Sequence, residues 1–261
     1  MNPVNAIAEL RLTTRVDHDR IERLLRVAEP MSLAHYATMM SGFDSFLRVW
    51  EPLVDAALPA RLKPWFRARR RGGMAAADVD WLRAVAGEPP RRMNTSAVAD
   101  LPLEHVAEVF GSLYVIEDSA IGGRVVAPRL HSMLGLSRGR GASFFHGFGG
   151  ETSAMWGDFR VLAAREIGTS DASMALACEG ARRTFAAMSA LFEPLVAAPL
   201  TLDIDLDLTP TPDCDITQVP VAIALPSVVP GMDLDIELEF GARPPRNGDI
   251  DSGHGELSLL R

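Results

Sequence analysis

The sequence predicts a mainly α-helical body followed by an acidic C-terminal extension. Between Asn5 and Val196, apolar residues recur with the period of amphipathic helices, and helix-capping or helix-ending residues separate the segments. After Pro199 the pattern changes to alternation of apolar and acidic residues, which is typical of a half-buried strand. We therefore expect a helical domain over residues 1–198 and an extension over 199–261 that is β-type or disordered.

Capping residues and prolines set the expected limits of the helices. Ser32 and Ser170 can each cap the helix that follows, and Pro102 suits the first turn of the longest one. The stretch 67–73 is expected to be a loop, and its basic cluster RARRR (residues 67–71) is expected to lie in solvent. The expected helices span 5–27, 33–58, 75–85, 102 to about 128 or 135, 153–166 and 171–196.

Composition excludes several classes of protein. The 261 residues are 48% hydrophobic, which is enough for a sizeable core, yet no run approaches the roughly 18 apolar residues of a membrane span. The N-terminus lacks the pattern of a signal peptide, and Cys178 and Cys214 lack metal-binding spacing, so we expect a cytoplasmic protein. The body has no clustered basic face of the kind that nucleic-acid binding requires.

The acidic extension carries most of the net charge. Residues 200–261 contain twelve acidic and three basic side chains, a net charge of −9, whereas the whole chain carries −8. The acidic residues lack the Asp/Asn-Gly loop spacing of calcium sites, so calcium binding is not expected.

Two adjacent glycines, Gly122 and Gly123, lie deep inside the longest expected helix. Each destabilises a helix interior by about 1 kcal/mol relative to alanine. A helix that tolerates them usually bends there or lets another group come close to its backbone. A flat ligand lying against the helix is one such group.

Four segments, in order, resemble motifs of the haem oxygenases, most closely the bacterial type often encoded beside bacteriophytochromes. The first resembles the N-terminal motif that carries the iron ligand, and the second resembles the distal helix. The third resembles the loop and helix that follow, and the fourth resembles the last helix. The resemblance covers about residues 5–197. The segments are LRLTTRVDHDRIE (10–22), GSLYVIEDSAIGGRVV (111–126), FFHGFGGETSAMWGDF (144–159) and TFAAMSALFEPL (184–195).

This resemblance implies an all-α, haem-oxygenase-like bundle that holds haem between the first helix and the distal helix. Haem would be both prosthetic group and substrate, cleaved with O₂ to biliverdin, CO and iron. The electrons would come from an external reductase, a ferredoxin or ascorbate. The implied partners are haem, an electron-donor protein and a bacteriophytochrome that could receive the biliverdin.

By the same resemblance, His18 is the expected iron ligand. A neutral imidazole would leave the opposite face of the iron free for O₂. Glu22, one turn on, would polarise or restrain that imidazole. Arg11 would pair with a haem propionate, and Thr14 would touch the proximal face.

Further residues are expected around the haem. Arg160 and Tyr114 could contact propionates, and small residues Gly122 and Gly123 would bring bare backbone close to the distal face. Two phenylalanines seven apart could wall the porphyrin, although aromatic residues at helical spacing mostly belong to a core. These two are Phe185 and Phe192.

Two distal positions differ from relatives. Asp118 stands one turn before Gly122, where the family usually has glycine. A carboxylate facing haem could crowd the O₂ site or relay protons. Ser119 stands where mammalian-type enzymes have aspartate, and it resembles the phytochrome-linked relatives. We therefore treat Asp118, Ser119 and Gly122 as candidate catalytic positions.

Three other functions fit part of the pattern. A haem-binding or haem-sensing protein of the same fold without turnover is the main alternative. A helical interaction module that docks to a phytochrome without haem is another. The same broad fold also hosts thiamin-degrading enzymes, but the context of their nucleophilic cysteine is missing from this sequence.

Overall fold

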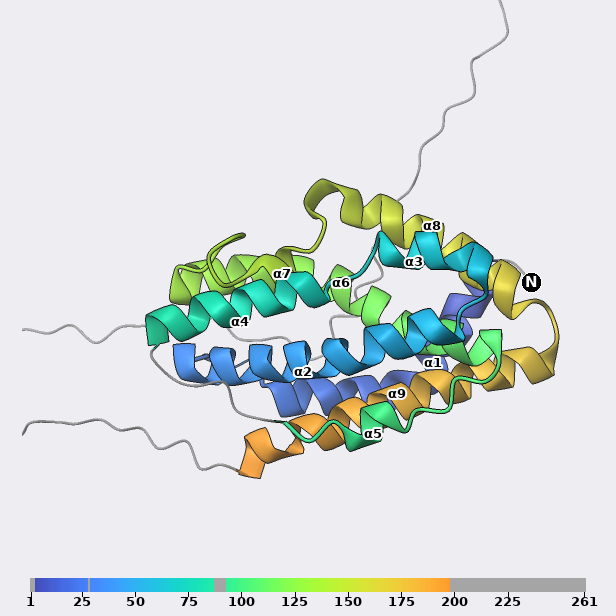
Figure 1. Cartoon of the computed structure of the whole chain (residues 1–261), viewed down its shortest axis with the longest axis horizontal. Coiled ribbons are helices and arrows are strands. Elements are labelled where there is room, and N and C mark those ends of the chain that lie inside the picture. The colour runs from blue at the N-terminus through green and yellow to red at the C-terminus, as the bar shows by residue number, and fades with distance from the viewer. Residues whose placement is uncertain (1–2, 28, 87–92, 198–261) are drawn as a thin grey trace, which may run out of the picture. The chain divides into compact units, whose positions relative to one another are not determined.

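In the computed structural model, the described residues (3–27, 29–86 and 93–197) form an all-α domain (Figure 1). These residues contain no β-strand, so the predicted all-α class is confirmed. The acidic stretch 199–261, for which we expected β-type or disordered structure, lies outside the described residues. Within the described part of the chain, we find no helix with the length and apolarity that a membrane span requires.

The six expected helices are present, with ends that shift by a few residues. Ser32 caps α2 as expected, because its hydroxyl accepts a hydrogen bond from the His35 N–H at 3.1 Å. Ser170 plays the same part for α9 by accepting the Ser173 N–H at 3.1 Å. The corresponding helices are α1 (Pro3–Leu25), α2 (Leu33–Ala57), α4 (Gly72–Ala86), α6 (Val106–Leu134), α8 (Thr152–Ile167) and α9 (Asp171–Ala197).

The start of α6 differs from the prediction at Pro102. His105 is the N-cap: its Nδ1 accepts the Ala107 N–H at 3.1 Å, and the Glu108 carboxylate accepts the His105 N–H at 2.9 Å. This reciprocal pair is a capping box built on histidine, a residue outside the usual cap set. At its other end α6 continues through Pro128 and ends at Leu134, and the residue that caps it is Gly135, whose φ of 66° favours glycine.

Three short α-helices and two 3₁₀ helices, η1 (Ala60–Leu62) and η2 (Gly149–Glu151), were not predicted within the described residues. Each has at most five residues, too few for a helical period to show in the sequence. Asp78 of α4 positions one of them, α7, by accepting the N–H groups of Ser143 and Phe144 at 2.8 and 2.7 Å. The short α-helices are α3 (Lys63–Arg67), α5 (Ser96–Ala99) and α7 (Ser143–His146).

Helix α9 packs along both α1 and α6 and so sets the spacing of the two helices that carry the candidate site. It meets α6 at a backbone-to-backbone crossing, because a β-carbon on Gly111 would overlap the carbonyl oxygen of Ala177. Beside this crossing, the hydroxyl of Ser112 accepts hydrogen bonds from Trp50 Nε1 at 2.8 Å and from Thr184 Oγ1 at 2.7 Å. This buried hydroxyl therefore joins α2, α6 and α9.

Candidate functional site

Two stripes of side chains, one on α1 and one on α6, make up the candidate site. Residues three or four apart share a face of a helix. On α1 the stripe is Arg11, Thr14 and His18; on α6 it is Tyr114, Asp118 and, one turn further, Gly122. Ion-pair and hydrogen-bond contacts join the stripes at the Arg11–Tyr114 end. The structure therefore brings together residues about 100 positions apart that we predicted to share one site.

Arg11 is the cation at the centre of these contacts. Its Nη2 lies 3.5 Å from Oδ1 of Asp118, and its guanidinium also hydrogen-bonds the Tyr114 hydroxyl. Tyr114 in turn is in hydrogen-bond contact with Thr14, whose own hydroxyl donates to the Leu10 carbonyl at 2.8 Å. The network fixes Tyr114 and Thr14, both buried, against the more exposed Arg11.

Burial dominates the titration of the acidic groups in this network. It raises the pKa of the Asp118 carboxyl, and the nearby Arg11 and His18 only partly oppose it. Burial, followed by the neighbouring Asp118, likewise raises the pKa of Tyr114. The side chain of Asp118 is 20% exposed, so this carboxylate depends on Arg11 for much of its stabilisation.

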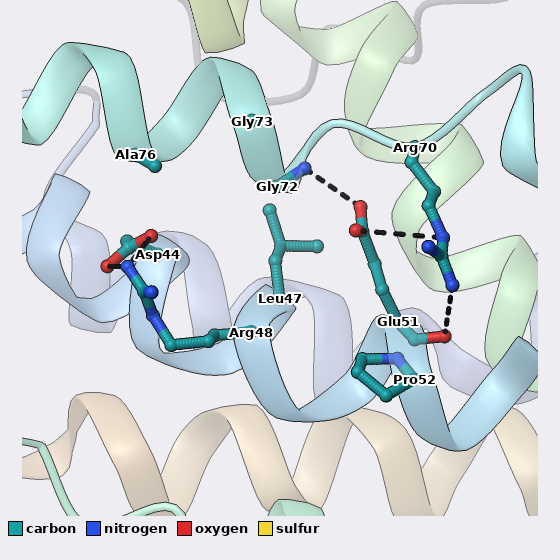
Figure 2. A pocket seen from close by; sticks show the side chains of 9 residues that line it. All are labelled: Asp44, Leu47, Arg48, Glu51, Pro52, Arg70, Gly72, Gly73 and Ala76. Atoms are coloured by element: carbon teal, nitrogen blue, oxygen red, sulfur yellow. Dashed lines mark hydrogen bonds and ion pairs between the residues drawn. The ribbon is translucent and has the colours of Figure 1, made fainter.

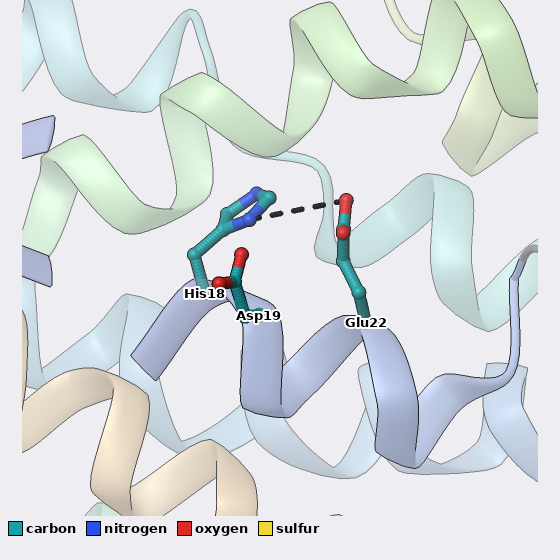
Figure 3. Close-up of side chains that lie close together, drawn as sticks. All are labelled: His18, Asp19 and Glu22. Carbon is teal, nitrogen blue, oxygen red and sulfur yellow. Dashed lines mark ion pairs between the residues drawn. The ribbon is translucent and has the colours of Figure 1, made fainter. Parts of the chain in front are cut away.

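His18 points from α1 toward α6 (Figure 3). Its Nδ1 lies 3.8 Å from Oε1 of Glu22, and its ring meets Phe185 of α9 edge-on, with 6.2 Å between ring centroids. The imidazole is 43% exposed, and within the described part of the chain its polar contact is made through Nδ1 while Nε2 has no hydrogen-bond partner. Nδ1 thus has a carboxylate nearby, at a distance longer than a hydrogen bond, and Nε2 is free to bind a metal.

Asp19 lies beside the same imidazole. Ligand atoms of His18, Asp19 and Glu22 all lie within 4.8 Å of one another (Figure 3). All three come from little more than one turn of α1, and both carboxylates are exposed. We did not predict Asp19 from the sequence, although it directly follows His18 in the chain.

Gly122 and Gly123 have different surroundings. A β-carbon on Gly123 would come within 2.6 Å of the Phe145 carbonyl oxygen, so this glycine lets α7 pack against α6. A β-carbon on Gly122 would meet no atom of the described chain within 4 Å. Helix packing therefore accounts for Gly123 but leaves Gly122 without a structural reason.

Ser119 faces a buried arginine. Its hydroxyl donates to the Ile116 carbonyl at 2.7 Å and accepts from Arg71 Nη2 at 2.7 Å. The same Arg71 nitrogen donates to the Ile116 carbonyl, and the guanidinium lies over the ring of Phe144. Burial lowers the pKa of Arg71 to about 10, which leaves the side chain charged at neutral pH. Ser119 thus fastens the α3–α4 connection to α6.

The prediction that the basic cluster 67–71 lies in solvent is wrong for two of its members, Arg69 and Arg71, which are buried. Arg69 makes two hydrogen bonds to the Glu117 carboxylate, at 2.8 and 3.2 Å, and another to the Met155 carbonyl. It also lies over the ring of Trp65. Glu117 and Met155 are far from Arg69 in the sequence, so the basic run alone could not reveal these hydrogen bonds.

The substitution Arg69→Met should lower the free energy of unfolding by about 3–5 kcal/mol, because it leaves the Glu117 carboxylate buried without its partner. The side chains of Arg69 and Glu117 are only 4% and 14% exposed. Urea denaturation of the full chain measures the effect. Arg67→Met is the matched control, since Arg67 pairs with Asp55 at the surface, and it should change stability little. Equal losses in the two variants would contradict the buried pair.

The remaining predicted residues are Phe185, Phe192 and Arg160, and they lie in different surroundings. Phe185 touches His18, whereas Phe192 packs in the core against Phe43 and Gly42 of α2. The half-buried Arg160 of α8 makes no hydrogen bond or ion pair with any described residue, so its charge is available to a ligand. Phe192 is therefore placed away from the two stripes.

A groove of about 260 Å³ lies elsewhere, between α2 and the start of α4 (Figure 2). Most of its charged side chains have partners within the chain: Arg48 pairs with Asp44, and the Glu51 carboxylate accepts the backbone N–H groups of Arg71 and Gly72 at 2.8 Å. Glu51 thereby caps α4 from a neighbouring helix. The charged residues of the groove therefore have structural roles, and none of its lining residues belongs to the two stripes.

No protein-family model matches the chain, and no curated protein sequence matches it. Among solved structures, the chain is similar to the haem oxygenase from Neisseria meningitidis, whose crystal structures contain NO and CO. The two share 19% sequence identity with a TM-score of 0.59, over 75% of this chain and 94% of that chain. The described helices therefore have the haem oxygenase fold.

Proposed function

We propose that the helical body, which we assign to residues 1–198, binds haem between α1 and α6 and cleaves it with O₂ and external electrons to biliverdin, CO and iron. Two observations carry the proposal: His18 on α1 has an Nε2 that no described residue occupies, and the exposed Gly122 continues the Tyr114–Asp118 stripe of α6 that contacts α1 at Arg11. One supplies a metal ligand with a free Nε2, and the other leaves space at the helix backbone. The likeness to a haem oxygenase supports it.

The residues present suit haem. His18 would ligate the iron, with Phe185 packed edge-on against its ring and the Glu22 carboxylate close enough to bond Nδ1 after a small side-chain movement. Arg11 and Arg160 are cations suited to the two propionates. Bound haem would supply the iron that activates O₂, and the electrons would come from a separate reductase, ferredoxin or ascorbate.

On the α6 side of the proposed site, the structure fixes the position of the helix backbone itself. Arg71 and Ser119 both bind the Ile116 carbonyl and so hold this turn of α6 in place. Gly122, two turns after Tyr114, would let the porphyrin lie close to the helix axis. We assign Gly123 to packing against α7. That packing helps to hold α6 where the porphyrin would lie against it.

A second function, haem binding without turnover, is favoured by one observation. Asp118 projects a carboxylate into the face between Tyr114 and Gly122 and contacts Arg11. A charged group there could obstruct O₂ or the propionate. Turnover of bound haem distinguishes the two functions.

Adding haemin to the purified full chain should give a Soret band that saturates at one equivalent. With O₂, ascorbate and catalase present, the Soret band should then disappear while biliverdin absorbance and chelatable iron appear. Catalase excludes attack on the ring by free peroxide. A Soret band that persists under these conditions would favour haem binding alone, and failure to form one would reject both functions.

A further inference from the structure

The Arg11–Asp118 pair has a feature that a simple haem pocket does not require. It joins α1 to α6 through a cation that the proposed function assigns to a haem propionate. Arg11 is 57% exposed and Asp118 is 20% exposed, so the guanidinium keeps a large solvent-accessible surface while it contacts the more buried carboxylate at 3.5 Å. The Tyr114 hydroxyl contacts the same guanidinium.

An aspartate side chain and a haem propionate end in the same chemical group. Each presents a carboxylate with one negative charge, and a guanidinium binds such a group through parallel N–H donors. Two carboxylates on one guanidinium repel each other, and the repulsion is strong where one of them is shielded from water. Asp118 and an incoming propionate would therefore compete for Arg11.

We propose that Asp118 is a built-in competitor for the substrate's carboxylate, which occupies Arg11 in the haem-free protein and must release it when a propionate binds. This inference rests on the proposed function. It assigns to Asp118 a role in the affinity for haem that is separate from any effect on O₂. Asp118 would lower the affinity for haem, because a propionate must displace it from Arg11 before it can bind there.

The test compares haemin with haemin dimethyl ester, whose propionates carry no charge. Asp118→Asn removes the charge of Asp118 and nearly keeps its shape. We expect it to tighten haemin binding about tenfold, within the usual range of coupling between two sites, and to leave binding of the ester unchanged. Soret titrations of the full chain give both dissociation constants.

Two controls separate competition from a general change of charge. In an Arg11→Gln background the contested cation is gone, so Asp118→Asn should no longer tighten haemin binding. Asp44→Asn removes the same charge from α2, where Asp44 pairs with Arg48 of its own helix, and should affect neither ligand. A thermal-melting comparison of the haem-free variants with Arg11 and Asp118 changed singly and together should show that the two residues couple.

Three outcomes would count against the proposal. Equal tightening for haemin and its ester would show that Asp118 acts on the ring and not on the propionate, and would overturn the competitor alone. Tightening that persists with Arg11→Gln would do the same. If neither wild type nor any variant gave a Soret band, the proposed function would fail and the competitor with it, so the two failures are distinguishable.

Discussion

The substitution His18→Ala is expected to lower haem affinity by at least about 100-fold. Losing only a supporting group around a metal ligand already costs about 10- to 100-fold, and this change removes the ligand itself. The position of His18 supports the expectation: it points toward α6, and no described residue hydrogen-bonds its Nε2. Soret titration of the full chain measures the loss, and added imidazole should restore part of the wild-type spectrum by filling the space.

Variants of the neighbouring residues separate ligation from packing. Glu22→Gln keeps a side chain of the same size near Nδ1 but removes its charge, so it should shift the ligand-sensitive spectrum of bound haem and leave the 1:1 stoichiometry unchanged. Phe185→Leu should have a similar effect by freeing the edge of the His18 ring. An unchanged Soret spectrum in His18→Ala would show that another residue holds the iron.

Local sequence signals were sufficient for the long helices. Serine caps and apolar periodicity placed α2 and α9 within a residue or two, because both signals act within one turn. They failed where the cap was unusual, at His105, and where the helix was too short for a period, as in α7. These failures moved the start of α6 but did not change the fold class.

The candidate site was predictable only along each helix. Helical spacing put Arg11, Thr14 and His18 on one face, and the structure keeps them there. Contacts between helices were invisible, because the Arg11–Asp118 pair and the burial of Arg69 depend on how α6 is placed in space. Phe185 and Phe192 are seven residues apart, and this spacing alone could not show that Phe185 contacts His18 while Phe192 packs in the core.

The adjacent glycines illustrate the same limit. From the sequence, Gly122 and Gly123 formed one break in a helix that needed one explanation. The structure gives Gly123 a packing role against the Phe145 carbonyl and leaves Gly122 beside open space. Of these two glycines, only Gly122 supports haem binding, and its open surroundings make it a useful reference for the other glycines of α6.

Gly111→Ala is expected to destabilise the protein by more than about 3 kcal/mol, beyond the usual cost of adding a methyl group to a packed core. The new β-carbon would overlap the carbonyl oxygen of Ala177, a backbone atom of α9 that cannot rotate away. A second glycine of the crossing, Gly180, likewise faces the Glu108 carbonyl, so the helices cannot slide to make room. Urea denaturation followed by circular dichroism measures the loss.

Gly122→Ala is the matched control, because it makes the same change in the same helix where no described atom lies within 4 Å. It should raise the stability of the haem-free protein by about 0.5–1 kcal/mol through better helix propensity. If Gly122 faces haem, the same variant should bind haemin more weakly although it is more stable. Equal unfolding midpoints for Gly111→Ala and wild type would contradict the close crossing of α6 and α9. Failure of Gly111→Ala to fold, beside a folded Gly122→Ala, would be the extreme form of the expected result.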